Sequence, residues 1–441
     1  MQAVARLLKS LGNQVAGSDM RDFEARLELE DEGITVYIGH DASHITADVD
    51  EVIYSVAIPE GNPEIVKAKE LKIPLRRRLE VVGEVMASRT GVAIAGTHGK
   101  TTTTTMITII LQAAGRYPTA LIGAEVRSMK SNFLYGTGPA MVVEACEFGR
   151  SFMDLRPKII VLTNLEADHL DYYKDLEDIK QAFVDFVKLL PKDGVVVANG
   201  DDENVKEVVE RAKPSRVVWA GFGENNDIRA TDLEFVDSSL YFSMNGSRLH
   251  LHVPGRHNVH NAVLAWAVAR ELGVDDMTVQ YALHDDFKGA ARRFEIIGTT
   301  KGVTFMDDYA HHPTEIQALM EGAKQYFKNR KLIVVFHPHQ YSRTRLLLND
   351  FAKSFQDADM VVVAPIYTAR DTEEDKKLVD SEKLVEAINQ VSNNAHYVGD
   401  FPQIKEFMLK TVQPGDVVIT LGAGQADVFG KELLEELRNQ K

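Results

Sequence analysis

The chain has 441 residues, 44% of them hydrophobic and 26% charged, which suits about three globular domains with buried cores. A formal net charge of −15 argues against a generic nucleic-acid or anionic-membrane binder. The single cysteine excludes an internal disulfide and favours a reducing compartment. No apolar run approaches the length of a membrane span, so we expect a cytoplasmic protein without a nucleic-acid or membrane partner. The composition leaves the oligomeric state open.

The first section alternates helices and strands as far as residue 89. Residues 1–12 carry apolar side chains on one helical face and end at a glycine, so they predict a helix. This segment lacks the continuous apolar core and the cleavage site of a secretion signal. The strands predicted in this section cover residues 13–19, 34–39 and 51–58.

The second section opens with a short apolar strand at residues 91–95, followed by the segment GTHGKTTTT from Gly96. Gly99, Lys100 and Thr101 supply the turn, the cation and the hydroxyl of a phosphate-binding loop, although Ile94 stands where the full motif has glycine. A strand, a glycine turn and a helix N-terminus together direct amides and a helix dipole at an anion. The alternative is a threonine-capped helix behind an ordinary turn. We expect a nucleotide to be bound by Gly96, Thr97, His98, Gly99, Lys100, Thr101 and Thr102.

Further apolar strands alternate with helical stretches to the end of the chain. This order predicts parallel sheets covered on both faces. We expect an α/β protein with mostly parallel, doubly wound sheets in three domains: residues 1–89, 90–291 and 292–441. The remaining predicted strands cover residues 140–145, 159–164, 195–199, 216–221, 302–308, 331–336, 360–365 and 416–420.

Carboxylates follow two strands of the second section, where α/β folds bind ligands. Glu144 and Glu147 lie in EACEF, and a carboxylate at such a strand end suits Mg²⁺. The alternative is a solvated acidic turn. The segment LEADHLDYY offers His169 as one ligand of a hydrated magnesium site, or it is a helix start capped by Asp168 or Asp171.

Polar clusters also flank the start of the third section. Asn258 and Asn261 share one helical face in PGRHNVHN, where their amides could pair with a purine edge or Asn258 could cap the helix. GAARRFE contains Arg292 and Arg293, which suit phosphate or form an ordinary surface pair.

Two further clusters follow predicted strands of the third section. In DDYAHHPTE, the residues Asp307, Asp308, His311 and His312 could ligate a metal, or Pro313 could begin a helix. HPHQYSRT carries His339, Ser342 and Arg343 at another strand end. No nucleophile elbow or cysteine–histidine pattern supports nucleophilic hydrolysis.

Taken together and in this order, these segments resemble the Mur ligase family across nearly the whole chain, and YSVAIPEGNPE (residues 54–64) is similar to a first-domain signature of that family. The resemblance implies an ATP- and Mg²⁺-dependent ligase of peptidoglycan precursor synthesis. It implies that an acyl phosphate of UDP-N-acetylmuramate is attacked by the amine of L-alanine. The alternatives are a recycling ligase that attaches a peptide to the same sugar, and a catalytically silent ATP-binding protein.

The resemblance also implies roles for single residues. It places ATP phosphates and Mg²⁺ on Lys100 and Thr101, adenine on Asn258 and Asn261, and further magnesium contacts on Glu144 and His169. The expected catalytic residues are Lys100, His169, Arg293 and Asp308, of which Arg293 and Asp308 close the nucleotide site. The expected substrate-binding residues are Ser18, Asp19, Ser55, His339, Ser342 and Arg343.

The sequence departs from the family pattern at two places. Cys146 stands where the family often has aspartate, so no magnesium role is expected there. The glycine turn that opens the UDP-binding domain is absent, because residues 1–12 lead directly into what resembles a second strand. We therefore expect a truncated or mis-assigned start, weak UDP-sugar binding and an intact ATP site, which calorimetry on an extended chain would test.

Overall fold

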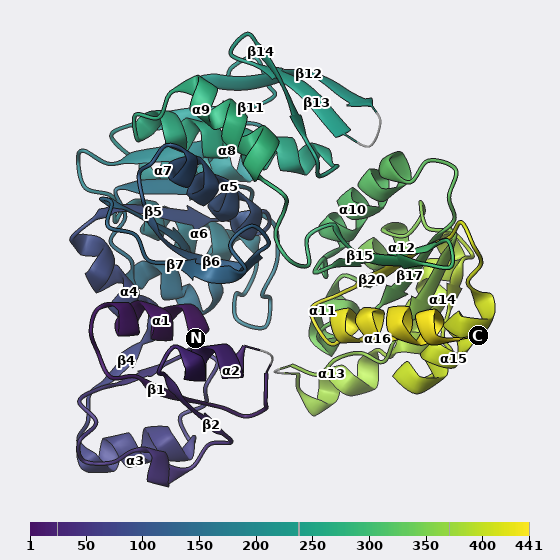
Figure 1. Ribbon diagram of the computed structural model, residues 1–441, viewed down its shortest axis with the longest axis horizontal. Helices are drawn as coiled ribbons and strands as arrows, with labels where there is room; N and C mark the ends of the chain where they lie inside the picture. The colour runs from purple at the N-terminus through teal and green to yellow at the C-terminus, as the bar shows by residue number, and fades with distance from the viewer. Residues whose placement is uncertain (24, 237–238, 370, 441) are drawn as a thin grey trace.

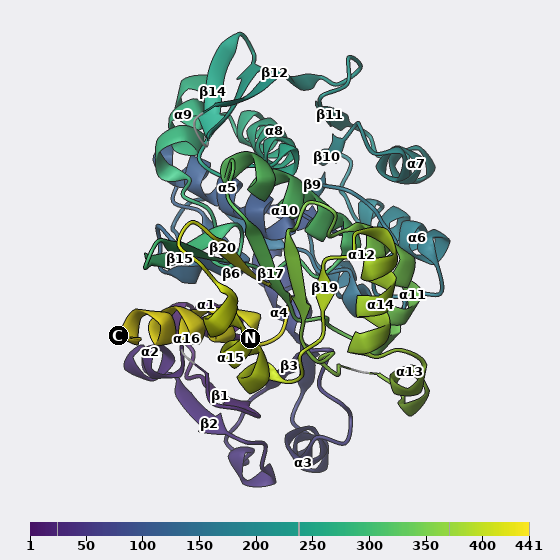
Figure 2. The same ribbon diagram turned by 90° about the vertical axis from the view of Figure 1, so that its right-hand side faces the viewer.

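The computed structural model describes residues 1–23, 25–236, 239–369 and 371–440. Its elements form three groups in chain order, and in Figure 1 the first group lies below the second while the third lies beside it. Helix α10 (Pro313–Tyr326) of the third group runs beside α8 (Arg256–Glu271) of the second in Figures 1 and 2. The second and third groups therefore meet along a face that both helices help to form.

The first group contains two separate pairs of parallel strands, β1 with β2 and β3 with β4. Its first helix, predicted over residues 1–12, ends at Ser10 and buries Val4 and Leu7 against the core of the second group. The elements are α1 (Gln2–Ser10), β1 (Ala16–Asp19), α2 (Arg26–Asp31), β2 (Thr35–Ile38), η1 (Ala42–His44), β3 (Val52–Tyr54), α3 (Pro63–Leu71), β4 (Leu75–Arg77) and α4 (Arg78–Ala87).

The second group is built on a sheet with the order β14-β13-β12-β11-β10-β9-β5-β8-β6-β7. Its neighbouring strands pair in parallel except for the antiparallel pairs β6–β7, β12–β13 and β13–β14. The strands are β5 (Thr90–Ala95), β6 (Thr119–Val126), β7 (Ser131–Leu134), β8 (Ala140–Glu144), β9 (Ile159–Leu162), β10 (Val195–Asn199), β11 (Val217–Gly221), β12 (Ile228–Val236), β13 (Ser239–Met244) and β14 (Ser247–Leu251).

Helices cover both faces of this sheet, which is why its central strands are apolar throughout. Val92 and Ile94 of β5 pack in the core that contains α5 and α8, whereas Ala93 and Ala95 pack in the opposite core with α4 and α6. The remaining helices of the group are α5 (Lys100–Ala113), η2 (Phe148–Asp154), α6 (Leu176–Val187), α7 (Glu203–Ala212), α9 (Asp276–Tyr281) and η3 (Ala282–Asp286).

The third group has a smaller sheet, ordered β15-β16-β20-β17-β18-β19, in which only β15 is antiparallel to its neighbour. Helices again cover both faces. The elements besides α10 are β15 (Glu295–Thr300), β16 (Val303–Asp308), β17 (Leu332–Phe336), α11 (Tyr341–Leu346), α12 (Leu348–Lys353), β18 (Met360–Val363), α13 (Glu373–Leu378), α14 (Ser381–Val391), β19 (Ala395–His396), α15 (Phe401–Thr411), β20 (Val417–Leu421) and α16 (Ala426–Asn439).

The predicted alternation of strands and helices is confirmed, and each predicted strand overlaps an observed one. The prediction did not single out the hairpin strands β12 to β14, which alternate buried and half-exposed residues instead of forming one apolar run. Among the described helices, none combines the length and apolar character that crossing a membrane requires.

Candidate functional site

The loop between β5 and α5 has a conformation that requires its glycines. Gly96 and Gly99 have φ values of 138° and 81°, a region that other residues rarely adopt. A Cβ at Gly99 would lie 2.4 Å from Oδ1 of Asn261, and one at Gly96 would lie 2.0 Å from Oγ1 of Thr163. Gly99 is the N-cap of α5, so the threonine-capped alternative is wrong. The amides of the first turn of α5 are thus left without a side-chain cap, as anion binding needs.

Lys100 bends back over this loop. Its ammonium group donates to the carbonyls of Gly96 and Thr97 and to Oε1 of Glu147, the last at 3.0 Å. Burial alone would lower the pKa of Lys100, but the Glu147 and Glu144 carboxylates raise it above its ordinary value. The lysine is therefore a fixed cation at the start of α5.

Glu144 and Glu147 both turn toward the loop from the end of β8. Oε2 of Glu144 accepts hydrogen bonds from the Thr101 hydroxyl and the Gly123 amide, each at 2.9 Å. Glu147 is only 5% exposed, and its Oε2 has no hydrogen-bond partner among the described residues. The solvated-turn alternative is therefore wrong. Sequence reasoning gave Glu147 no separate role, although its spacing from Glu144 was the available signal.

His169 joins the same group from the loop after β9. Its Nε2 lies 3.7 Å from Oε1 of Glu147, and its backbone is left-handed with φ 52°. The next helix, α6, starts at Leu176 with Asp175 as N-cap, so the alternative of a cap by Asp168 or Asp171 is wrong. Thr101, Glu144 and His169 thus lie around Lys100 and Glu147, and they offer the oxygen-rich donor set that suits Mg²⁺.

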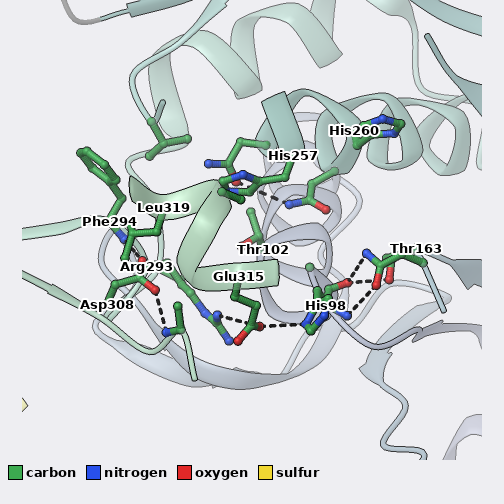
Figure 3. Close-up of a pocket in the computed structure, with 18 of the residues that line it drawn as sticks. His98, Thr102, Thr163, His257, His260, Arg293, Phe294, Asp308, Glu315 and Leu319 are labelled. Atoms are coloured by element: carbon green, nitrogen blue, oxygen red, sulfur yellow. Dashed lines mark hydrogen bonds and ion pairs between the residues drawn. The ribbon is translucent and has the colours of Figure 1, made fainter. Parts of the chain in front are cut away.

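A cavity lies on the other side of the loop, between the second and third groups (Figure 3). Part of its wall comes from the loop and from α8, and part from the beginning of the third group. The structure therefore brings together residues that are far apart in sequence and that were predicted to bind the nucleotide. Those that line it are His98, Gly99, Thr102, Asn258, Asn261, Arg293 and Asp308.

The two asparagines are buried on the α8 side of the cavity. Asn261 accepts from the Thr103 hydroxyl at 3.2 Å and its amide nitrogen lies 3.4 Å from Oδ1 of Asn258. Asn258 donates to the carbonyl of Pro254, whereas the N-cap of α8 is Gly255. The capping alternative for Asn258 is therefore wrong, and the shared helical face is confirmed.

The third group contributes a carboxylate and a guanidinium to the opposite wall. Asp308 accepts from the amides of Phe294 and Ala310 at 2.7 and 2.8 Å, and burial raises its pKa to about 6. The guanidinium of Arg293 lies over the ring of Tyr309 and 3.9 Å from Glu315. Its neighbour Arg292 donates to Asp307, so these arginines do not form an ordinary surface pair.

Direct contacts cross the cavity between the two groups. Nδ1 of His98 lies 3.0 Å from Oε1 of Glu315, and Thr314 donates to Oε2 of Glu166 at 2.6 Å. Figure 3 shows Glu315 between Arg293 and His98. Glu315 and Thr314 stand in the first turn of α10, which begins at Pro313 with His312 as N-cap, as the sequence indicated. Sequence reasoning missed Glu315, for which the capping position was the only local signal.

A second contact region lies near His169. Arg343 is buried and donates to Oδ1 of Asp168 at 2.9 Å. Despite burial, the Arg343 guanidinium keeps the pKa of Asp168 well below its usual range. Ser342 donates to Asp371, and the His339 ring stacks on Tyr367. Of the predicted residues in HPHQYSRT, Arg343 thus meets the LEADHLDYY segment, whereas these contacts of Ser342 and His339 stay within the third group.

The substrate-binding residues predicted in the first group lie elsewhere. Ser18 donates to Oε2 of Glu64 at 2.6 Å, Asp19 accepts from the Arg21 amide, and Ser55 accepts from the Ala57 amide. None of the three lines the described cavity. The loop after Ser55 does approach the second group, since a Cβ on Gly149 would lie 3.5 Å from Val56.

Comparisons with known proteins agree with this arrangement. The chain matches the Mur ligase family catalytic domain at residues 1–90, the Mur ligase middle domain at 94–269 and the Mur ligase glutamate ligase domain at 292–424. It is 40% identical to a UDP-N-acetylmuramate–L-alanine ligase of Sulfurihydrogenibium over 99% of this chain and 96% of that protein. A protein of the same name from Clostridium acetobutylicum is 41% identical over 99% and 95% of the two chains.

Solved structures show the same fold. A UDP-N-acetylmuramate–alanine ligase from Thermotoga maritima has a TM-score of 0.84 at 29% identity, over 100% of this chain and 97% of its own. A murein peptide ligase from Psychrobacter arcticus has a TM-score of 0.74 at 25% identity, over the same shares of the two chains. The chain belongs to the Mur ligase family of ATP-dependent, amide-bond-forming ligases.

Proposed function

We propose that the protein joins L-alanine to UDP-N-acetylmuramate at the expense of ATP, in cytoplasmic synthesis of a peptidoglycan precursor. The observation that carries this proposal is the cavity in which the glycine loop, Asn258 and Asn261 face Arg293 and Asp308. Two groups of the chain together supply the parts of a nucleotide site, and relatives at about 40% identity over nearly the full length bear the name of this activity.

The residues around the loop fit a bound nucleotide. A helix N-terminus without a side-chain cap and two glycines that exclude a Cβ leave room for phosphates on residues 96–102. Asn258 and Asn261 would meet the adenine from α8, and Arg293 would meet it or its phosphates from the far wall. Lys100 would stabilise negative charge as it develops on the transferred phosphoryl group.

Magnesium would be held by Thr101, Glu144 and His169. The unpartnered Oε2 of Glu147 and the contact of the Thr101 hydroxyl with Glu144 support an ion at this place, because hard oxygen donors suit Mg²⁺. A bound magnesium ion would neutralise charge on the phosphates. Glu147 would keep Lys100 and His169 in place beside it.

The amino acid and the acyl group would bind at the second contact region, where Arg343 meets Asp168. His339, Ser342 and Arg343 would position the amino acid and the acyl group next to His169, and Asp168 would hold the guanidinium of Arg343 in place. Ser18, Asp19 and Ser55 would contact the UDP-sugar from the first group. Closure of the second and third groups on one another would exclude water from the hydrolysable acyl phosphate.

A phosphate-release assay tests the proposal. ATP, Mg²⁺ and UDP-N-acetylmuramate are supplied together with L-alanine, L-serine, glycine or a cell-wall tripeptide in separate reactions. We expect release to be fastest with L-alanine. Faster release with the tripeptide would instead assign the recycling activity. ATP binding without release in any reaction would mean that the protein binds the nucleotide but is not a ligase.

A further inference from the structure

Three side chains of the interface between the second and third groups form a further cluster, and two of them, His98 and Glu166, also line the cavity. They are His98 from the glycine loop, Glu166 from the loop after β9 and His312 at the N-cap of α10. Their ligand atoms all lie within 4.8 Å of one another. None of the three is among Thr101, Glu144 and His169, to which we assign magnesium.

The distances within the cluster suit a small metal ion. Oε2 of Glu166 lies 3.5 Å from Nε2 of His98 and 3.6 Å from Nδ1 of His312. Ligand atoms about 2.0 Å from a tetrahedral zinc ion are separated by roughly 3.3 Å. A shift of a few tenths of an ångström would therefore bring each of these two pairs to the separation that tetrahedral coordination needs.

The cluster has polar atoms that its protein contacts leave unused. Nε2 of His98 and Nε2 of His312 are buried without a hydrogen-bond partner among the described residues, whereas Nδ1 of His312, which lies 3.6 Å from Glu166, accepts from the Thr314 amide at 3.4 Å. His312 is only 4% exposed, and the two imidazole rings lie 5.0 Å apart between their centres. A buried polar atom without a partner is costly, and a bound ion would remove that cost for His98.

Neighbouring side chains hold His98 and Glu166 in fixed orientations, as residues that contact the ligands of a metal site usually do. Glu315 lies 3.0 Å from Nδ1 of His98, an arrangement that fixes the ring and leaves Nε2 for a metal. The hydroxyl of Thr314 donates to the Glu166 carboxylate at 2.6 Å and so fixes its direction. Both partners come from the first turn of α10.

We infer that His98, Glu166 and His312 form a binding site for a divalent transition-metal ion of the zinc type, which ties the glycine loop to helix α10. Two imidazoles and one carboxylate favour such ions, whereas Mg²⁺ prefers oxygen ligands. His98 and Glu166 belong to the second group and His312 to the third, so the site is complete only when the groups are docked. The bound ion stabilises this docked arrangement.

Calorimetric titration of the untagged full-length chain with Zn²⁺, in excess Mg²⁺ to fill oxygen sites, tests the inference. We expect one Zn²⁺ per chain, a rise of the melting temperature with Zn²⁺ and the visible absorption of tetrahedral Co²⁺ when Co²⁺ replaces it. His312→Gln and Glu166→Gln should each weaken Zn²⁺ binding by more than about tenfold, the loss that even an outer partner of a ligand can cause.

An exposed histidine on another element gives a matched control. His396 lies in β19, an edge strand of the third-group sheet, and is not part of the cluster, so His396→Gln should leave Zn²⁺ affinity unchanged. Melting without metal shows whether each variant is folded. The inference is overturned if no Zn²⁺ binds, or if binding survives His312→Gln. If His284→Gln abolishes Zn²⁺ binding instead, then the ion binds at the histidines beside the β13–β14 hairpin, and the inference is likewise overturned. These histidines are His250, His252 and His284.

Discussion

The second and third groups face one another as two walls of an interface, and these walls hold their functional groups in different ways. On the wall of the second group, Lys100 pairs with Glu147 and Thr101 with Glu144, so these side chains are fixed within one group. On the wall of the third group, Arg343 pairs with Asp168 and Glu315 with His98, and both contacts cross the interface. The side chains of the first wall are thus held in place by their own group, whereas those of the second wall are held in place only when the second and third groups are docked.

The largest expected effect tests the dependence on docking. Asp168→Ala would leave the buried guanidinium of Arg343 without its carboxylate, and breaking a buried ion pair in this way costs about 3–5 kcal/mol. We expect a loss of that order in denaturant unfolding, together with loss of turnover. The same change should expose the interface to limited proteolysis.

The double variant separates the pair from its surroundings. Arg343→Met alone removes the charge that Asp168 compensates, and Asp168→Ala with Arg343→Met leaves no buried charge. We expect the double variant to recover much of the stability lost by Asp168→Ala, although not the turnover. If the two single losses simply add, then the ion pair does not hold the groups together.

A change on the self-contained wall should affect chemistry and leave docking intact. Lys100→Ala removes the cation expected to act on developing charge, and loss of one such group costs on the order of 10²–10³ in turnover. The chain should stay folded, although the buried Glu147 carboxylate loses its partner, so the melting temperature should fall. Phosphate release and thermal melting are measured together, with the exposed Lys188→Ala as control. Activity within about tenfold of the parent protein would contradict the assignment.

Arg293→Ala and Asp308→Ala should reduce ATP-dependent turnover even though both residues lie outside the second group. They line the proposed nucleotide site from the third group, so we expect losses of about tenfold or more, with weaker ATP binding for Arg293→Ala. Lys353→Ala, at an exposed position of α12, is the control. Parental turnover and ATP affinity in both variants would show that the nucleotide site does not span two groups.

The difference between the walls also explains what the sequence could predict. Strands such as β10 are buried on both faces and read as apolar runs, and the glycine loop has a local motif, so both were predicted. The family membership and fold class expected from the ordered segments are confirmed. The individual site roles and exact domain limits stay predictions.

Contacts that cross the interface have no local signal. Asp168 and Arg343 are 175 positions apart, and His98 and Glu315 are 217 apart. Periodicity describes one element at a time, so it cannot say which charge of one group will meet which charge of another. The sequence therefore identified the segments that carry the chemistry but not the pairs by which they dock.

The smallest expected effect is a pH dependence that arises only on the wall of the third group. Burial raises the pKa of Asp308 from 3.8 to about 6, because the ionised carboxylate is poorly solvated and Arg293 compensates only in part. Below pH 3.8 the carboxyl is protonated in both folded and unfolded chains. As the pH rises from about 4 to 6, the folded protein holds this proton longer than the unfolded chain, so stability falls through this window and the decrease ends above it.

Asp308→Asn keeps the shape of the side chain but does not titrate. Its amide meets the Phe294 and Ala310 amides less well than a carboxylate does, so we expect a constant loss of stability from the substitution itself. The informative quantity is the slope, against pH, of the difference in unfolding free energy between the parent protein and Asp308→Asn. Between pH 4 and 6, the parent protein should lose stability relative to Asp308→Asn by at most about 1.4 kcal/mol per pH unit, and above pH 6.5 the difference should be flat. Denaturant unfolding of both proteins across this range measures it, and a difference that is independent of pH would mean that the carboxylate of Asp308 is solvated, contrary to its place in the wall.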